Sequence, residues 1–227
     1  MMRQDQLLEF LAPYVSASRK ETIDQNLESR TNYLTLVLED IYNPHNANAV
    51  VRSCECFGVQ QLHVIEERNE YQISPNVLQG SAKWIDLIRY NKPKAKNIEI
   101  CYKGLKDQGY KIVATKPTPD STSIRDIDIS TPMALVFGTE LGGLTDSALA
   151  NADEQIYIPM FGFTESFNIS VGAALCMYEI LGRIRKSEIK WELTKKIKDK
   201  LRLDWYKKSV HRIEILEAEF DRQLEMK

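Results

Sequence analysis

Short apolar segments alternate with amphipathic ones over most of this chain. Six segments have the β-branched, apolar composition of buried strands. They are residues 33–39, 61–65, 84–90, 110–115, 133–138 and 155–160. Four segments have helical spacing instead, and they begin at the break "NPHN" with Asn46 as the N-cap, near residue 94, near residue 145 and at Asn168. This alternation predicts an α/β fold, a parallel sheet with helices on both faces.

The two ends of the chain lack strand patterns. Residues 1–30 are polar and helical in spacing, and residues 187–227 read as one or two amphipathic helices rich in lysine. The segment 116–132 holds three prolines, which argue against a helix there. We therefore expect three parts: an N-terminal helical extension at 1–30, an α/β domain at 31–186 and a C-terminal basic helical extension at 187–227.

The composition is that of an ordinary globular protein, because 43% of the 227 residues are hydrophobic and 27% are charged. The chain has no run of eighteen apolar residues that would predict a membrane span. The N-terminus carries Asp5 and Glu9 and has no cleavage site of a secretory signal. The four cysteines and three histidines lack the spacing of a zinc site or a disulfide framework. We expect a cytoplasmic protein without a bound metal.

Positive charge is concentrated near the C-terminus. The net charge is −2, yet residues 183–212 hold twelve Lys or Arg against four Asp or Glu. Such a segment on an acidic body can bind the phosphates of a nucleic acid, and it can equally be a helix with a solvated charged face. The charge pattern alone leaves both interpretations open.

In an open parallel sheet, ligands bind beyond the carboxyl ends of the strands. Four segments lie there, namely "EDIYNPHNANAVVR", "ATKPTP", "FGTELGGLT" and "IPMFGFTESFNIS". None has the glycine spacing of a dinucleotide site or of a phosphate loop, and no G-x-S-x-G elbow indicates a serine hydrolase. The residues by themselves predict a glycine-lined pocket and a basic tail, and they do not name a reaction.

Three segments resemble the sequence motifs of a known family. "NPHNANAVVRSCECFGV", "ALVFGTELGGLT" and "IPMFGFTESFNISVGAALCMYE" are similar, in order and separation, to the motifs of the SpoU/TrmH branch of the SPOUT methyltransferases. The resemblance covers residues 33–185 and implies a fold with a C-terminal deep trefoil knot. It also implies a homodimer that transfers a methyl group from S-adenosyl-L-methionine to a ribose 2′-hydroxyl in RNA. The flanking helices resemble those of the tRNA guanosine 2′-O-methyltransferase subgroup, which implies tRNA as the substrate, at a guanosine of the D-loop.

The resemblance assigns roles residue by residue. The catalytic positions that it implies are Asn46, Arg52, Glu140, Ser166 and Asn168. The cofactor contacts that it implies are Thr115, Gly138, Ile158 and Phe167. The RNA contacts that it implies are Arg19, Arg30, Arg183 and Arg185. Phe167 stands where the family usually has leucine. The change is mild if the cofactor contact is made by the backbone, and it reshapes the pocket if the side chain packs on the adenine.

Several of these residues have a second interpretation. Arg52 lies opposite the apolar stripe of its helix, as a solvated charge does. A guanidinium has a pKa above about 12 and hardly ever loses its proton, so we expect Arg52 to act as a cation rather than as a base. Asn46 and Asn168 can serve as N-caps alone, because that is the commoner role of asparagine at the start of a helix.

Two alternative functions also fit the motifs. One is ribose 2′-O-methylation of ribosomal RNA, and the other is RNA binding without catalysis by a protein of the same fold. Many relatives that act on ribosomal RNA carry a separate N-terminal substrate domain, and the thirty residues before Tyr33 are too few for one. The residue types that the resemblance implies are present at all five catalytic positions, which favours an active enzyme over a non-catalytic protein.

Overall fold

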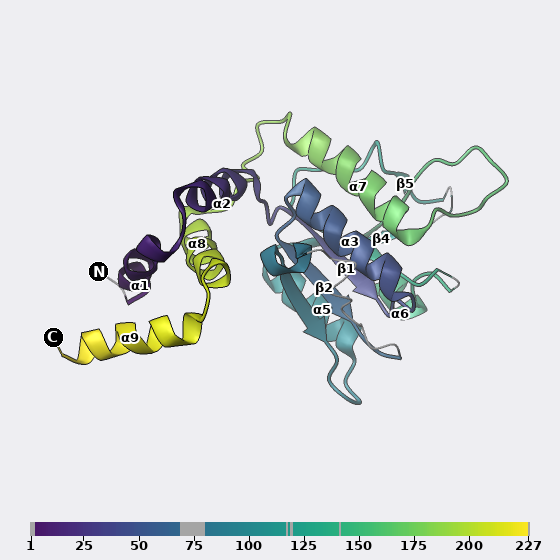
Figure 1. The fold of residues 1–227 in the computed structure, drawn as a ribbon. Helices are drawn as coiled ribbons and strands as arrows, with labels where there is room; N and C mark the ends of the chain where they lie inside the picture. Colours follow the sequence, from purple (N-terminus) through teal and green to yellow (C-terminus); the bar gives the residue numbers. More distant parts are fainter. Residues whose placement is uncertain (1–2, 69–79, 117, 119, 141, 227) are drawn as a thin grey trace. The chain divides into compact units, whose positions relative to one another are not determined.

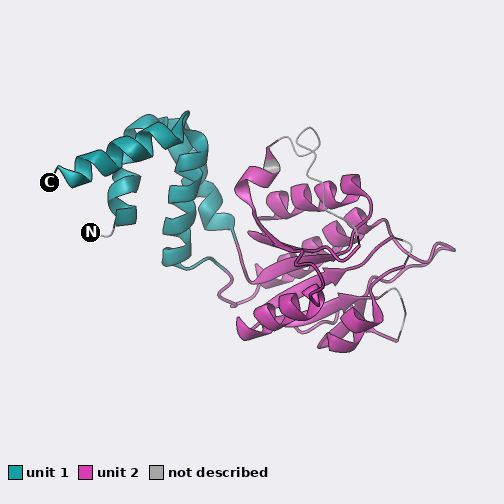
Figure 2. Ribbon diagram, turned by 90° about the horizontal axis from the view of Figure 1, so that it is seen from below, with its two compact units in different colours: residues 1–30, 192–227 teal, residues 31–191 magenta. Residues whose placement is uncertain are grey.

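A computed structural model describes the chain except for residues 1–2, 69–79, 117, 119, 141 and 227 (Figure 1). By their internal contacts the described residues form two compact units. One unit is residues 31–191, and the other combines residues 1–30 with residues 192–227 (Figure 2). The first unit holds the sheet, and the second consists of helices.

The sheet has seven described strands, and every pairing between neighbouring strands is parallel. Its strands lie in the order β3-β2-β1-β6-β4-β7-β5. Their bounds are β1 (Leu34–Glu39), β2 (Gln61–Ile65), β3 (Asp86–Tyr90), β4 (Lys111–Thr115), β5 (Thr122–Ser123), β6 (Met133–Phe137) and β7 (Glu154–Tyr157). All six residues of β1 are buried, as expected for a central strand of a parallel sheet. The predicted parallel sheet is confirmed.

Helices cover both faces of the sheet (Figure 1). Helices α3 (Pro44–Phe57) and α7 (Ile169–Ile184), with the short η2 (Ser81–Trp84), pack with Leu36 and Leu38 of β1 in one buried cluster. Helices α5 (Asn97–Asp107) and α6 (Asp146–Asn151) pack with Val37 in the other. Successive residues of β1 therefore point to opposite faces and bury against different helices. The prediction of helices on both faces is confirmed.

Helix α3 begins earlier than the sequence predicts. The side chain of Asn43 caps it by accepting the backbone N–H of His45 at 2.9 Å, and Pro44 occupies the first turn. The prediction that Asn46 is the N-cap is therefore wrong. Pro44 fits the first helical position because its fixed φ suits a helix and it has no N–H to leave unpaired. Asn46 lies inside the first turn, and its side chain makes other contacts.

The second unit contains α1 (Arg3–Leu11), η1 (Ala12–Tyr14), α2 (Ala17–Ser29), α8 (Lys195–Ser209) and α9 (Ile213–Glu225). The two ends of the chain thus fold together, although the sequence analysis treats them as separate extensions. Trp205 and Tyr206 of α8 are buried, so they anchor the helices. Arg202 pairs with Asp24 at 2.8 Å and links α8 to α2. In the part of the chain that the structure describes, no helix has both the length and the hydropathy needed to cross a bilayer.

Candidate active site

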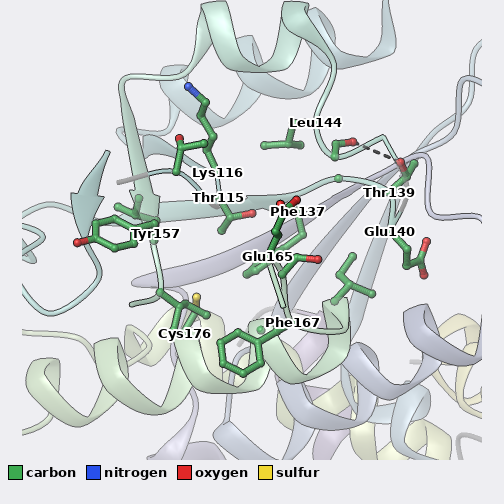
Figure 3. A pocket seen from close by; sticks show the side chains of 18 of the residues that line it. Thr115, Lys116, Phe137, Thr139, Glu140, Leu144, Tyr157, Glu165, Phe167 and Cys176 are labelled. Carbon is green, nitrogen blue, oxygen red and sulfur yellow. Dashed lines mark hydrogen bonds between the residues drawn. The ribbon is translucent and has the colours of Figure 1, made fainter. Parts of the chain in front are cut away.

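A cavity of about 460 Å³ lies at the carboxyl ends of β4, β6 and β7 (Figure 3). The lining residues include Thr115 at the end of β4, Phe137 at the end of β6 and Tyr157 at the end of β7. The other lining residues come chiefly from 138–140, from 142–144 and from the segment that leads into α7. This is the place where an open parallel sheet binds its ligands, and the volume suits a small molecule.

The glycine-rich segment after β6 forms one wall. Gly138 approaches the backbone so closely that a Cβ atom there would lie 2.2 Å from the carbonyl carbon of Gly143 and 2.3 Å from the nitrogen of Leu144. Thr139 donates its N–H to the Gly143 carbonyl at 2.9 Å and accepts the Gly143 N–H at 3.0 Å. Gly143 adopts a φ of 64°, which glycine reaches without strain. These contacts fold the segment back on itself beside the cavity.

The segment between β7 and α7 forms the opposite wall. Ile158, Glu165, Ser166 and Phe167 line the cavity, and Phe167 keeps 43% of its surface exposed. Figure 3 shows Glu165 and Phe167 between the strand ends and helix α7. Cys176 of α7 also lines the cavity, and burial raises the pKa of its thiol to about 12. The thiol therefore stays protonated and contributes shape rather than nucleophilic chemistry.

A chain of hydrogen bonds joins three predicted catalytic residues. The Asn168 side chain donates from Nδ2 to Oδ1 of Asn46 at 3.0 Å, and Asn46 donates from Nδ2 to Oε1 of Glu140 at 2.5 Å. Asn168 also caps α7, because its Oδ1 accepts the N–H of Ser170 at 2.9 Å and the Ser170 hydroxyl at 2.6 Å. Because that oxygen faces Ser170, the NH2 of the Asn168 side chain faces Asn46. The start of α3, the loop after β6 and the start of α7 are thereby linked.

Ser166 and Arg52 lie outside this hydrogen-bonded chain. Ser166 lines the cavity and is exposed. Arg52 is exposed on α3, six residues beyond Asn46 and therefore about 9 Å further along the helix axis. It is absent from the residues that line the cavity in the described chain. The predicted roles of both residues stay predictions.

Arg183, Arg185 and Arg30, which are predicted to contact RNA, make contacts within the fold. Arg183 donates to the carbonyl oxygens of Ile124 and Ile127 at 3.3 and 2.7 Å. Arg185 donates to the carbonyl of Phe57 at 2.6 Å, and its guanidinium lies over the ring of Trp191. Arg30 is buried with its guanidinium 5.3 Å from the centre of the Trp205 ring. Arg19 is exposed on α2.

Sequence reasoning missed several residues of the cavity. Lys116, Leu144, Tyr157 and Met160 line it. Lys116 and Met160 were within reach of prediction, because each stands at or just after the end of a predicted strand. Tyr157 was missed because the predicted strand continues to residue 160, whereas β7 ends at Tyr157. The side chain of Leu144 was missed because an apolar residue in a loop does not reveal which cavity it faces. Among the described residues, no three His, Cys, Asp or Glu side chains gather as metal ligands would.

Residues 33–178 match the model of the SpoU rRNA Methylase family. The chain belongs to the SpoU methylase family. Relatives of this SpoU methylase include the tRNA (guanosine(18)-2′-O)-methyltransferase of Borreliella burgdorferi, which is 42% identical over 91% of this chain and 93% of the relative. The enzyme of the same name from Thermus thermophilus is 31% identical over 84% of this chain and 97% of the relative.

Solved structures agree with the fold. The TrmH/SpoU tRNA modifying enzyme of A. aeolicus superposes on this SpoU methylase with a TM-score of 0.75 and 28% identity, covering 86% of this chain and 98% of that one. The methyltransferase AviRb of Streptomyces viridochromogenes gives a TM-score of 0.60 at 21% identity, covering 72% and 65% of the two chains. The second likeness supports the fold alone. The predicted trefoil knot stays a prediction.

Proposed function

We propose that this chain transfers a methyl group from S-adenosyl-L-methionine to the 2′-hydroxyl of a guanosine in tRNA. The observation that carries the proposal is the 42% identity, over nearly the whole of both chains, to a protein named tRNA (guanosine(18)-2′-O)-methyltransferase. The hydrogen-bonded chain of Asn168, Asn46 and Glu140 supports it, because these residues match the family's motifs and meet beside one cavity.

The cavity fits S-adenosyl-L-methionine by size and by chemistry. Apolar side chains such as Leu144 and Ile158 offer surfaces to an adenine ring, and backbone groups of the two loop walls offer hydrogen bonds. The carboxyl groups of Glu140 and Glu165 line the cavity and complement the positive charge of a sulfonium and an amine. We infer that Thr115, Gly138, Ile158 and Phe167 belong to the residues that hold the cofactor.

The cofactor, when bound, supplies an electrophilic methyl group. The residues of this chain then have to place a ribose hydroxyl in line with it, and orientation of this kind lowers a barrier by several kcal/mol. Asn46 and Asn168 have fixed amide orientations, so they are suited to hold the ribose and its hydroxyl. The guanidinium of Arg52 serves as a cation for a phosphate next to the target ribose or for the developing alkoxide.

A homodimer and a cytoplasmic location complete the proposal. Val171, Leu175 and Tyr178 follow one another at helical spacing on α7 and are 46%, 40% and 70% exposed. Phe161 and Phe163, in the segment before α7, are almost fully exposed. We propose that a second copy of the chain covers the α7 stripe, because contiguous exposed apolar surface marks an interface. The cytoplasm is proposed because tRNA is the proposed substrate.

Methyl transfer separates this function from its alternatives. Purified protein is incubated with labelled S-adenosyl-L-methionine and either unmodified tRNA or ribosomal RNA, and nucleosides from each are then analysed. The proposal predicts 2′-O-methylguanosine in tRNA and no label in ribosomal RNA. Label confined to ribosomal RNA would keep the chemistry and overturn the substrate. Cofactor binding without label in either RNA would favour a non-catalytic RNA-binding protein.

A further inference from the structure

A buried carboxylate lies beneath the glycine-rich wall and has no part in the chemistry described above. Glu39 is the last residue of β1 and is 2% exposed. Both of its carboxylate oxygens accept hydrogen bonds from Thr145, one from the hydroxyl at 2.6 Å and one from the backbone N–H at 3.0 Å. The two residues are 106 positions apart in the sequence. The pair therefore ties the central strand to the segment that follows β6.

Thr145 stands where the glycine-rich wall ends. Its hydroxyl oxygen accepts the N–H of Ala148 at 3.2 Å and so caps α6. Leu144, the residue before it, lines the cavity, and the Leu144 nitrogen belongs to the backbone against which Gly138 is packed. The wall is thus held at its start by β6 and at its end by Thr145. A shift of Thr145 would therefore displace Leu144, its neighbour in the cavity lining.

Burying a carboxylate costs free energy unless hydrogen bonds compensate for its lost hydration. Burial raises the pKa of Glu39, the hydrogen bonds from Thr145 oppose that rise, and the nearby charges of Asp40 and Glu67 add to it. An apolar side chain would avoid the loss of hydration, but it would leave the Thr145 N–H without its acceptor. The two oxygens of a carboxylate can accept the N–H and the O–H of Thr145 at the same time.

We propose that Glu39 is a positioning residue that sets the glycine-rich wall for cofactor binding. The inference rests on the proposed function, because the wall is taken to hold S-adenosyl-L-methionine. Glutamine has the shape of glutamate but only one acceptor oxygen in place of two. Glu39→Gln should therefore weaken cofactor binding about tenfold, the scale of one hydrogen bond to a charged group. Because Glu39 is buried, the KM for tRNA should stay unchanged.

The experiment measures the cofactor Kd of the full chain by calorimetry and the hydrogen exchange of the wall peptide. The variants are Glu39→Gln, Thr145→Val and their double mutant. Glu66→Gln is the matched control, because Glu66 is also a buried carboxylate at the end of a strand, paired with Arg89 at 2.6 Å and outside the cavity lining. Thermal unfolding of every variant reports on loss of stability alone.

We expect each single variant to bind the cofactor about tenfold more weakly. The double mutant should lose less than the two single losses combined, because both single variants disturb the same Glu39–Thr145 contact, although Thr145→Val also removes the cap of α6. Exchange should quicken in the peptide around Gly143 and Thr145 in these variants, and Glu66→Gln should change neither measurement. A wild-type Kd in Glu39→Gln would overturn the inference, as would additive losses in the double mutant. If Glu39→Gln does not fold, a wild-type Kd in Thr145→Val would overturn the inference, because that variant lacks the hydroxyl that binds Glu39. Wild-type protein that does not bind the cofactor would instead overturn the proposed function.

Discussion

The contact at Gly138 allows one substitution to be worked out in advance. In Gly138→Ala the new Cβ would lie 2.2 Å from both the carbonyl carbon and the oxygen of Gly143, whereas ordinary contact begins at 3.4 Å. The obstacle is backbone, so no side chain can rotate away. The wall must therefore move by more than 1 Å. Overpacking of this kind destabilises a protein by about 1–3 kcal/mol.

The consequence for cofactor binding should exceed the consequence for folding. A displaced wall changes the cavity at Gly138, Thr139 and Leu144 at once, so we expect the Kd for S-adenosyl-L-methionine to rise about 100-fold, which is about 3 kcal/mol. Titration calorimetry measures that change, and thermal unfolding measures stability. Gly104→Ala is the control, because Gly104 lies in α5 with nothing within 4 Å of a new Cβ. It should stabilise the protein by about 0.5–1 kcal/mol and leave binding unchanged.

The reasoning has a clear point of failure. If Gly138→Ala binds the cofactor with wild-type affinity and unfolds at the wild-type temperature, the close approach of Gly138 to Gly143 is not a feature of the protein in solution. If only stability falls, the cavity does not hold the cofactor where we propose.

Three further predictions use other parts of the structure. Asn46→Ala should lower kcat about 100-fold with little change in the cofactor Kd. Asn43→Ala removes the cap of α3, so it should lower stability by about 1 kcal/mol and leave kcat unchanged. Equal kcat values in the two variants would contradict the catalytic role proposed for Asn46. Burial lowers the pKa of His63 to about 4, so its contribution to stability is complete above pH 6.5 and is lost as the pH falls toward 4. Between pH 7.5 and pH 4.5, the free energy of unfolding measured with urea should fall by about 2–3 kcal/mol more in the wild type than in His63→Phe. An equal fall in both proteins would contradict this contribution of His63. Leu175→Lys should convert a dimer to a monomer in light scattering, and an unchanged dimer would exclude the α7 stripe as the interface.

The pattern of apolar segments predicts the layers of the fold well, because central strands such as β1 and β6 are buried on both faces and are therefore apolar. Residues 61–65, for example, match β2 residue for residue. The short strand β5 lies in a segment where the pattern predicts no strand. The order of the strands is a different matter. Strand β6 lies between β1 and β4, and this pairing joins Leu36 to Leu135 across about a hundred residues, so no local pattern encodes it.

Site residues could be predicted where they belong to a sequence motif. They could not be predicted where a contact in the folded chain determines what a residue does. Asn46 is hydrogen-bonded to Glu140, and its catalytic role stays a prediction. Its predicted role as N-cap is wrong, because Asn43 and Pro44 together make the better start of the helix. The sequence also gave no sign that Arg183 is held by two backbone carbonyls. Glu39 looked like one more residue of a buried strand, since only the folded chain brings Thr145 to it.

The central claim is methyl transfer to a guanosine ribose in tRNA, and mapping the methyl group tests it most directly. An unmodified tRNA transcript is incubated with S-adenosyl-L-methionine and the protein, digested and mapped by mass spectrometry, with Asn46→Ala as the inactive comparison. The account predicts one 2′-O-methylguanosine per tRNA, in the D-loop, and almost none with the variant. A methyl group on a base, on another nucleotide, or present equally with Asn46→Ala would contradict it.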